Sequence, residues 1–265
     1  MTHDALTLVG LRSAAAGAIA LAFGGAPLGV LMVARRLSLL GDAMSLGIRP
    51  AVAIAFLLAG NNPLALLAGA LMAGMVVAGL SSLLSRGGKL ADDAAFAIFY
   101  LAALALGILL LGRAHDPEAV QSLLFGSTTA LDAAGLITAG LAASATLISL
   151  ALFLRGVLGE GADPMFMRTA GGRFGAAHIL LMLLLALNLV AGFRAFGALM
   201  TVALMTVPAA AARYWAKSYG GQACAAIALS AASGLTGLAL SALWSVQPGA
   251  LMALCASVLF ARSTL

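Results

Sequence analysis

The residues best suited to bind a cation lie in a short polar pattern around Asp42. Asp42 is the only acidic residue between Asp4 and Asp92, and the stretch around it is almost wholly apolar. A carboxylate near the middle of a membrane helix costs about 2.5 to 3.5 kcal/mol on insertion scales. A residue placed at such a cost indicates a function, and a cation pathway is the first one to consider.

Two more polar side chains share the helix face of Asp42. Ser45 follows it by three residues and Arg49 by seven. The guanidinium of Arg49 would lie about 10 Å along the helix from Asp42 and would oppose a bare metal ion there. Arg49 can instead pair with a carboxylate on another helix, and Asp132 is one candidate.

Two interpretations of Asp42 stay open. In the first, Asp42 caps a helix or pairs with Arg35, Arg36 or Arg49 near the membrane interface. In the second, its carboxylate contacts a metal ion transiently during transport. Asp42, Ser45 and Arg49 are therefore candidate residues of a cation pathway, and the pattern does not decide between these roles.

The elements that must position these residues are membrane helices. The chain contains 63% hydrophobic and 9% charged residues and has a mean hydropathy of +1.11, whereas soluble domains contain about 25% charged residues. Apolar runs of about 20 residues, the length that crosses a bilayer, recur from end to end. We expect an all-α, polytopic bundle that forms one transmembrane domain over residues 1–265. The expected spans are 9–33, 40–60, 63–85, 90–112, 130–154, 178–194, 198–213, 221–243 and 249–262.

The start of the chain and the helix contacts follow from the same composition. No Lys or Arg precedes the first apolar run, so we expect the first helix to be retained rather than cleaved as a signal peptide. Small residues at spacings of four predict close helix packing, at Gly25 to Gly29, Ala70 to Gly74 and Ser233 to Gly237. Cys224 and Cys255 have no CxxC spacing and are expected to be small buried residues.

The basic residues predict the orientation of the spans. If all nine cross, the positive-inside rule makes the more basic side the cytoplasm and leaves the N-terminus outside. The cytoplasmic residues would be Arg35, Arg36, Arg86, Lys89, Arg155, Arg168, Arg173, Arg213, Lys217 and Arg262, and those outside would be Arg12, Arg113 and Arg194. Spans 178–194 and 198–213 are short and nearly adjacent, so one of them can be broken or re-entrant. The expected count is eight or nine.

The longest expected connection, residues 155–177, lies on the cytoplasmic side. Asp163 can cap a short helix that begins at Pro164, and Gly171 or Gly172 can end it. One interpretation is a short amphipathic helix on the cytoplasmic face. The other is a simple connecting loop, and both stay open on composition alone.

The sequence lacks the motifs of a P-loop ATPase, a His-Glu-x-x-His metalloprotease and an aspartyl intramembrane protease. Gly88-Lys89 is followed by Leu90, where a phosphate-binding loop needs Ser or Thr, so the chain is not expected to hydrolyse ATP. A His-Glu-x-x-His motif does not occur, and neither does the Tyr-Asp pair that an aspartyl intramembrane protease needs beside its Gly-Asp. We therefore expect a transport protein rather than an enzyme.

The order of several motifs resembles a known family, the permease subunits of zinc and manganese ABC importers. The resemblance covers nearly the whole chain, and its most specific part is the block from Arg194 to Arg213, with Gly197 and Pro208 between them. The other matching pieces are Gly25-Ala-Pro-Leu-Gly-Val30, Arg35-Arg36, Leu39-Leu-Gly-Asp-Ala-Met-Ser45, Asp93, Leu123-Leu-Phe-Gly126 and Asp163-Pro-Met-Phe-Met167 with Gly171.

The resemblance implies a set of partners. Such permeases are homodimers in the bacterial plasma membrane, with two cytoplasmic ATPase subunits that bind ATP and an external or periplasmic protein that delivers the metal. The segment that contains Asp163, Pro164, Arg168, Gly171 and Arg173 would be the coupling helix that docks on the ATPase. No permanently bound cofactor and no nucleic acid are expected, and membrane lipid surrounds the chain.

The resemblance also exposes two departures from the family pattern. Family members carry a histidine four residues after the Asp of the Gly-Asp pair, whereas this chain carries Leu46 there, and Arg49 is foreign to the family pattern. We expect a divalent transition metal as the cargo, with zinc favoured by family prevalence. Manganese, iron or a metal chelate is the alternative cargo, and a transporter that works without an ATPase is the alternative mechanism.

Overall fold

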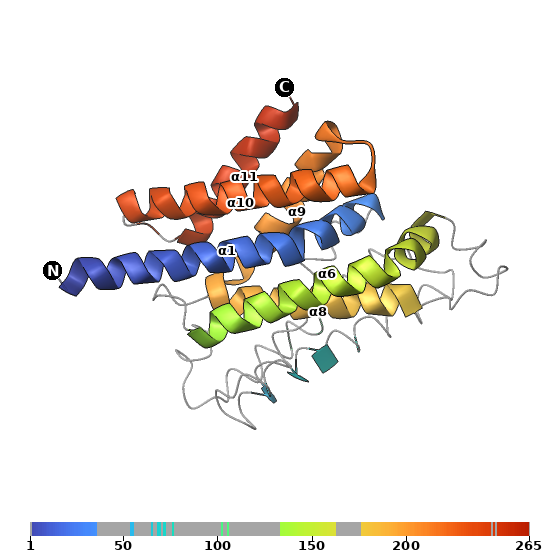
Figure 1. Ribbon diagram of the computed structural model, residues 1–265, viewed down its shortest axis with the longest axis horizontal. Helices are drawn as coiled ribbons and strands as arrows, with labels where there is room; N and C mark the ends of the chain where they lie inside the picture. The colour runs from blue at the N-terminus through green and yellow to red at the C-terminus, as the bar shows by residue number, and fades with distance from the viewer. Residues whose placement is uncertain are drawn as a thin grey trace.

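The computed structural model is a bundle of long helices (Figure 1). It describes residues 2–35, 133–162, 176–244, 246 and 248–264, together with ten isolated helical positions between 54 and 105. The helices in this part of the chain are α1 Thr2–Ala34, α6 Ala133–Ala162, α8 Ala176–Phe196, α9 Ala198–Trp215, α10 Tyr219–Trp244 and α11 Pro248–Thr264. Within these residues the fold is all-α, as the composition predicts.

Three of these helices contain apolar stretches long enough to cross a bilayer, namely Gly10–Ala34, Gly135–Gly159 and Tyr219–Trp244. Two shorter apolar helices, Ile179–Phe193 and Pro248–Thr264, accompany them. The described part of the chain holds six helices and so does not support the expected count of eight or nine. Most of the expected spans 40–60, 63–85 and 90–112 lies outside the described residues.

The helices run in two opposite directions. Gly249 of α11 lies near Met200 at the start of α9, and Phe260 lies against Tyr214 at the end of α9, so α9 and α11 run the same way. Helices α1 and α6 share that direction. The C-terminal end of α1 meets the C-terminal end of α9, where Arg213 contacts Val33. It also meets the C-terminal part of α6, where Arg35 contacts Val157. Helices α8 and α10 return in the opposite direction (Figure 1).

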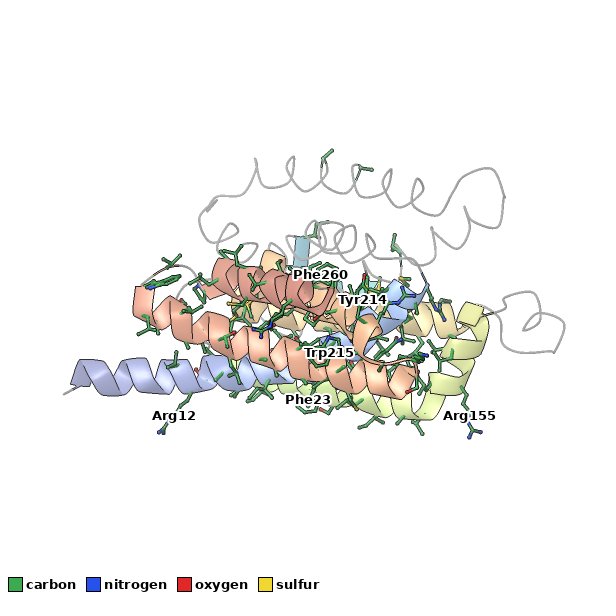
Figure 2. All side chains as sticks on the ribbon, turned by 90° about the horizontal axis from the view of Figure 1, so that it is seen from above. Arg12, Phe23, Arg155, Tyr214, Trp215 and Phe260 are labelled. Carbon is green, nitrogen blue, oxygen red and sulfur yellow. The ribbon has the colours of Figure 1, made fainter. Side chains whose placement is uncertain are left out.

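This arrangement collects basic residues at one end of the bundle, which we call the basic end. It carries Arg35, Arg155, Arg213, Lys217 and Arg262, whereas Arg12 and the backbone of Arg194 lie toward the opposite end. Figure 2 shows Arg12 and Arg155 far apart along the bundle. The described residues thus divide between the two sides as the sequence predicts, and the positive-inside rule assigns the basic end to the cytoplasm.

Small residues allow close contact where the helices cross. A Cβ on Gly29 would overlap the Met205 carbonyl of α9, and one on Gly25 would lie 3.6 Å from the Met205 side chain. A Cβ on Gly237 of α10 would collide with the backbone of Met252 in α11. The predicted close packing is confirmed at these glycines. The pair Ala70 and Gly74 lies outside the described residues.

Candidate functional site

The predicted cation pathway and the predicted coupling segment lie outside the described residues. This holds for Asp42, Ser45 and Arg49, and for Asp163, Pro164, Arg168, Gly171 and Arg173. The first part of the expected connection, residues 155–162, belongs to α6, which continues eight residues beyond the expected end at 154. The site is therefore built from the block Gly197 to Arg213 and the helices that contact it.

Gly197 forms the whole connection between α8 and α9. Its φ of 89° is a conformation that favours glycine, and it lets α9 begin at the residue after it. The Gly197 N–H donates to the Phe193 carbonyl at 3.1 Å, and the Thr201 hydroxyl donates to the Gly197 carbonyl at 2.8 Å. A Cβ on Gly192 would collide with the Thr201 side chain. The two helices are thus separate elements joined by a single tightly packed residue.

Pro208 interrupts the hydrogen bonds of α9 at its middle. Proline has no N–H, so the carbonyl of Leu204, four residues earlier, loses its helical donor. The hydroxyl of Ser230 in α10 donates to this carbonyl at 2.9 Å. Ser230 is completely buried, so the bond forms away from water. Thus α10 supplies the donor that Pro208 lacks.

The basic end is held together by side chains that reach backbone carbonyls of other helices. Arg35 Nη2 donates to the Val157 carbonyl of α6 at 2.6 Å. Arg213 Nη1 donates to the Val33 carbonyl at 3.5 Å. This carbonyl is one of the last four of α1 and therefore has no donor within that helix.

Tyr219, the first residue of α10, makes a third contact of this kind. Its hydroxyl donates to the Pro27 carbonyl of α1 at 3.2 Å. Together, Arg35, Arg213 and Tyr219 join α1 to α6, α9 and α10.

A buried polar contact joins α1, α6 and α8 nearer the middle of the bundle. Asn188 Nδ2 donates to Thr146 Oγ1 at 2.6 Å and to the Leu184 carbonyl at 2.8 Å. Thr146 in turn donates to the Ala142 carbonyl at 2.7 Å. Asn188 Oδ1 has no hydrogen-bond donor among the described residues, and it faces Gly24, where a Cβ would collide with it.

These groups can hold helices in place, but their chemistry is not that of a metal site. The described residues contain no group of three or more His, Cys, Asp and Glu side chains that could hold a metal. The buried polar side chains among them are Thr146, Asn188, Thr201, Ser230 and Ser233. Cys224 is exposed and Cys255 is half-buried, so the prediction that both are buried is wrong for Cys224.

Sequence reasoning missed Asn188, Thr146 and Ser230. An Asn among the leucines of the run 178–194 is a detectable signal, because a polar side chain in a membrane helix needs a partner. The partner itself could not be found in this way, since Thr146 precedes Asn188 by 42 residues.

Comparisons to known proteins agree with the all-helical architecture. Residues 9–265 match the ABC 3 transport family. A manganese transport system membrane protein from Halalkalibacterium halodurans is 31% identical over 236 residues, which cover 88% of this chain and 79% of that protein. A high-affinity zinc uptake system membrane protein from Haemophilus influenzae is 28% identical over 239 residues, 90% of each chain.

A solved structure extends this likeness to three dimensions. PsaBC from Streptococcus pneumoniae, in complex with Fab, is similar with a TM-score of 0.84 and 26% identity, over 96% of this chain and 90% of that one. The family match and the apolar spans of the present chain identify it as a multi-pass protein of the bacterial inner membrane. The chain belongs to the ABC 3 transport family and is a permease of the zinc and manganese type of ABC importer.

Proposed function

We propose that this permease moves a divalent transition metal into the cytoplasm, and that manganese is the first candidate cargo, ahead of zinc. Leu46 carries this choice, because it stands where the family resemblance expects a histidine. Carboxylate, hydroxyl and carbonyl oxygens suit manganese, whereas imidazole suits zinc. With Leu46 in place, the metal ligands that Asp42 and Ser45 would offer on the expected helix face are oxygen atoms alone, beside the guanidinium of Arg49. The manganese names of several relatives support the same choice.

The energy for transport would come from partner subunits. We propose a permease homodimer with two cytoplasmic ATPase subunits and an external metal-binding protein. The absence of a phosphate-binding loop from the sequence supports a separate ATPase. The segment from Asp163 to Arg173 begins directly after α6, at the basic end of the bundle, which supports a role in docking the ATPase.

Uptake by cells tests the proposed function. The permease is expressed with its ATPase and binding protein in a strain without other high-affinity manganese or zinc uptake, and the uptake of labelled manganese and zinc is measured separately. We expect ATPase-dependent uptake with manganese preferred. Zinc uptake alone would return zinc to first place, and uptake by the permease without any ATPase would support the ATPase-independent transporter.

A further inference from the structure

The cytoplasmic ends of α9 and α11 form a corner with a distinctive chemistry. Tyr214 and Phe260 join the two helices through an edge-on ring contact, with 6.3 Å between the ring centroids and 68° between the ring planes. Trp215 follows Tyr214, and these two side chains are 66% and 64% exposed. The exposed cations Lys217 and Arg262 lie two or three residues beyond the aromatic pair. Figure 2 shows Phe260 beside Tyr214.

The charge of this corner is not balanced nearby in the sequence. All nine acidic residues of the chain precede residue 164, and Arg168, Arg173, Arg194, Arg213, Lys217 and Arg262 follow it. Arg213 is exposed as well but donates to the Val33 carbonyl of α1, whereas Lys217 and Arg262 are exposed at the corner itself. The charge therefore complements an anion.

An apolar track leads along α11 to Arg262. Leu254, Val258 and Arg262 are spaced by four residues and so lie on one face of the helix. Leu254 is 60% exposed and Val258 is 66% exposed. This face complements a phospholipid, because its apolar residues lie toward the membrane interior, where the acyl chains are, and its cation lies at the interface, where the phosphate is. Tyr and Trp are typical of the same interfacial level.

We propose that this corner, formed by Tyr214, Trp215, Lys217, Phe260 and Arg262, binds the headgroup of an anionic phospholipid in the cytoplasmic leaflet. One acyl chain lies along Leu254 and Val258, and the phosphate contacts Arg262 and Lys217. The continuous apolar track favours a lipid over an acidic protein surface, which would need no such track. The proposal does not depend on which metal the permease carries.

The two tryptophans of the chain provide a test with an internal control. Trp215 marks the proposed site and Trp244 lies at the end of α10 near the opposite end of the bundle. The full-length permease is placed in nanodiscs, either as Trp244→Phe, which leaves Trp215, or as Trp215→Phe, which leaves Trp244. Fluorescence quenching is then compared between brominated phosphatidylglycerol and brominated phosphatidylcholine.

We expect phosphatidylglycerol to quench Trp215 at lower mole fractions than phosphatidylcholine, with no such preference at Trp244. Each cation near an anionic leaflet contributes about 1 kcal/mol, or about fivefold in affinity. Lys217→Gln with Arg262→Gln should therefore remove most of the preference at Trp215, whereas Arg12→Gln should leave it intact. Circular dichroism and gel filtration verify that the variants are folded.

Two results would overturn the proposal. One is equal quenching of Trp215 by the two lipids, and the other is a lipid preference that survives the loss of both cations. If the double variant keeps the lipid preference but no longer retains the ATPase subunit during purification, the corner is a protein docking surface instead.

Discussion

The hydroxyl of Ser230 lies 2.9 Å from the carbonyl oxygen of Leu204 and donates to it across the contact between α10 and α9. Pro208 makes this bond necessary, because it removes the helical donor of the same carbonyl. The hydrocarbon core of the bilayer holds no water to replace a missing donor, and a Ser or Thr side chain of a neighbouring helix can take its place. Two residues far apart in sequence thus depend on each other.

Ser230→Ala should destabilise the permease by about 1 to 3 kcal/mol, because the buried Leu204 carbonyl would be left without a donor. The midpoint of unfolding in detergent, followed by circular dichroism, measures this loss. Ser257→Ala is the matched control, since Ser257 donates to the Ala253 carbonyl of its own helix and is exposed. Equal effects of the two substitutions would show that the bond to Leu204 has no special role.

Gly24→Ala should destabilise the bundle by about 1 to 3 kcal/mol through overpacking. The added Cβ would collide with Asn188 Oδ1 and would lie 2.9 Å from the Ala143 Cα, a backbone atom that cannot move aside alone. Gly140→Ala in α6 serves as the control, because a Cβ there meets nothing within 4 Å. The same unfolding assay should show no loss for Gly140→Ala. A similar loss in both variants would contradict this account of the contact.

Asn188 and Thr146 should show a measurable interaction in a double-mutant cycle. Interhelical hydrogen bonds in membrane proteins contribute about 0.6 kcal/mol on average and up to about 1.7 kcal/mol. We expect a coupling in the upper half of this range for Asn188→Ala with Thr146→Ala, because the pair is buried and 2.6 Å apart. Asn188→Ala with Thr236→Ala provides the reference. Thr236 bonds only carbonyls of α10, so its coupling to Asn188 should be zero.

Tyr219→Phe should weaken the contact between α10 and α1 at the basic end by about 0.5 to 1.5 kcal/mol, because the hydrogen bond to the Pro27 carbonyl is lost while the ring remains. Tyr214→Phe is the control, since Tyr214 is 64% exposed and keeps its ring contact with Phe260. Thermal unfolding of the two variants should differ accordingly. If Tyr214→Phe proves the more damaging change, the assignment of Tyr219 is wrong.

Asp42→Asn separates a helix-capping role of Asp42 from metal contact. Asparagine caps a helix as well as aspartate does, so a capping role should leave metal uptake nearly unchanged. If the carboxylate contacts the metal, this variant removes the charge that attracts it. A loss of about 1.4 kcal/mol in the interaction with the metal corresponds to a factor of about ten, so uptake of manganese and zinc should fall by about tenfold or more. Asp4→Asn, a carboxylate near the N-terminus, is the matched control. Full uptake by Asp42→Asn at equal protein level would exclude metal contact by this residue.

The sequence predicted the helices of the described region because apolar runs and their basic ends are local signals. The expected spans 178–194 and 198–213 correspond to α8 and α9, and Gly197 marks the turn between them. The expected end at 154 was too early because Arg155 and Glu160 were interpreted as the start of a loop, whereas α6 continues through them to Ala162. A charged residue at the end of a span can still be helical, so helix ends are less predictable than helix centres.

The contacts between helices are much harder to predict from the sequence. Small-residue spacing predicted that Gly25 and Gly29 make a close contact, but not that the contact is with Met205 of α9. Pro208 was identified through the family resemblance, yet nothing near it in sequence points to Ser230 as the donor for Leu204. Such pairings depend on how whole helices are oriented, and a single sequence does not contain that information locally.

The single-residue turn at Gly197 also sets a limit on how this family can vary in length. Each residue added to an α-helix rotates the later turns of that helix by about 100°. An insertion beside Gly197 would turn the Leu204 carbonyl away from Ser230, and would move Thr201 away from Gly192. We therefore expect insertions and deletions among relatives to fall outside the stretch from Gly192 to Arg213, because one extra residue there would put the rest of α9 out of phase with its neighbours.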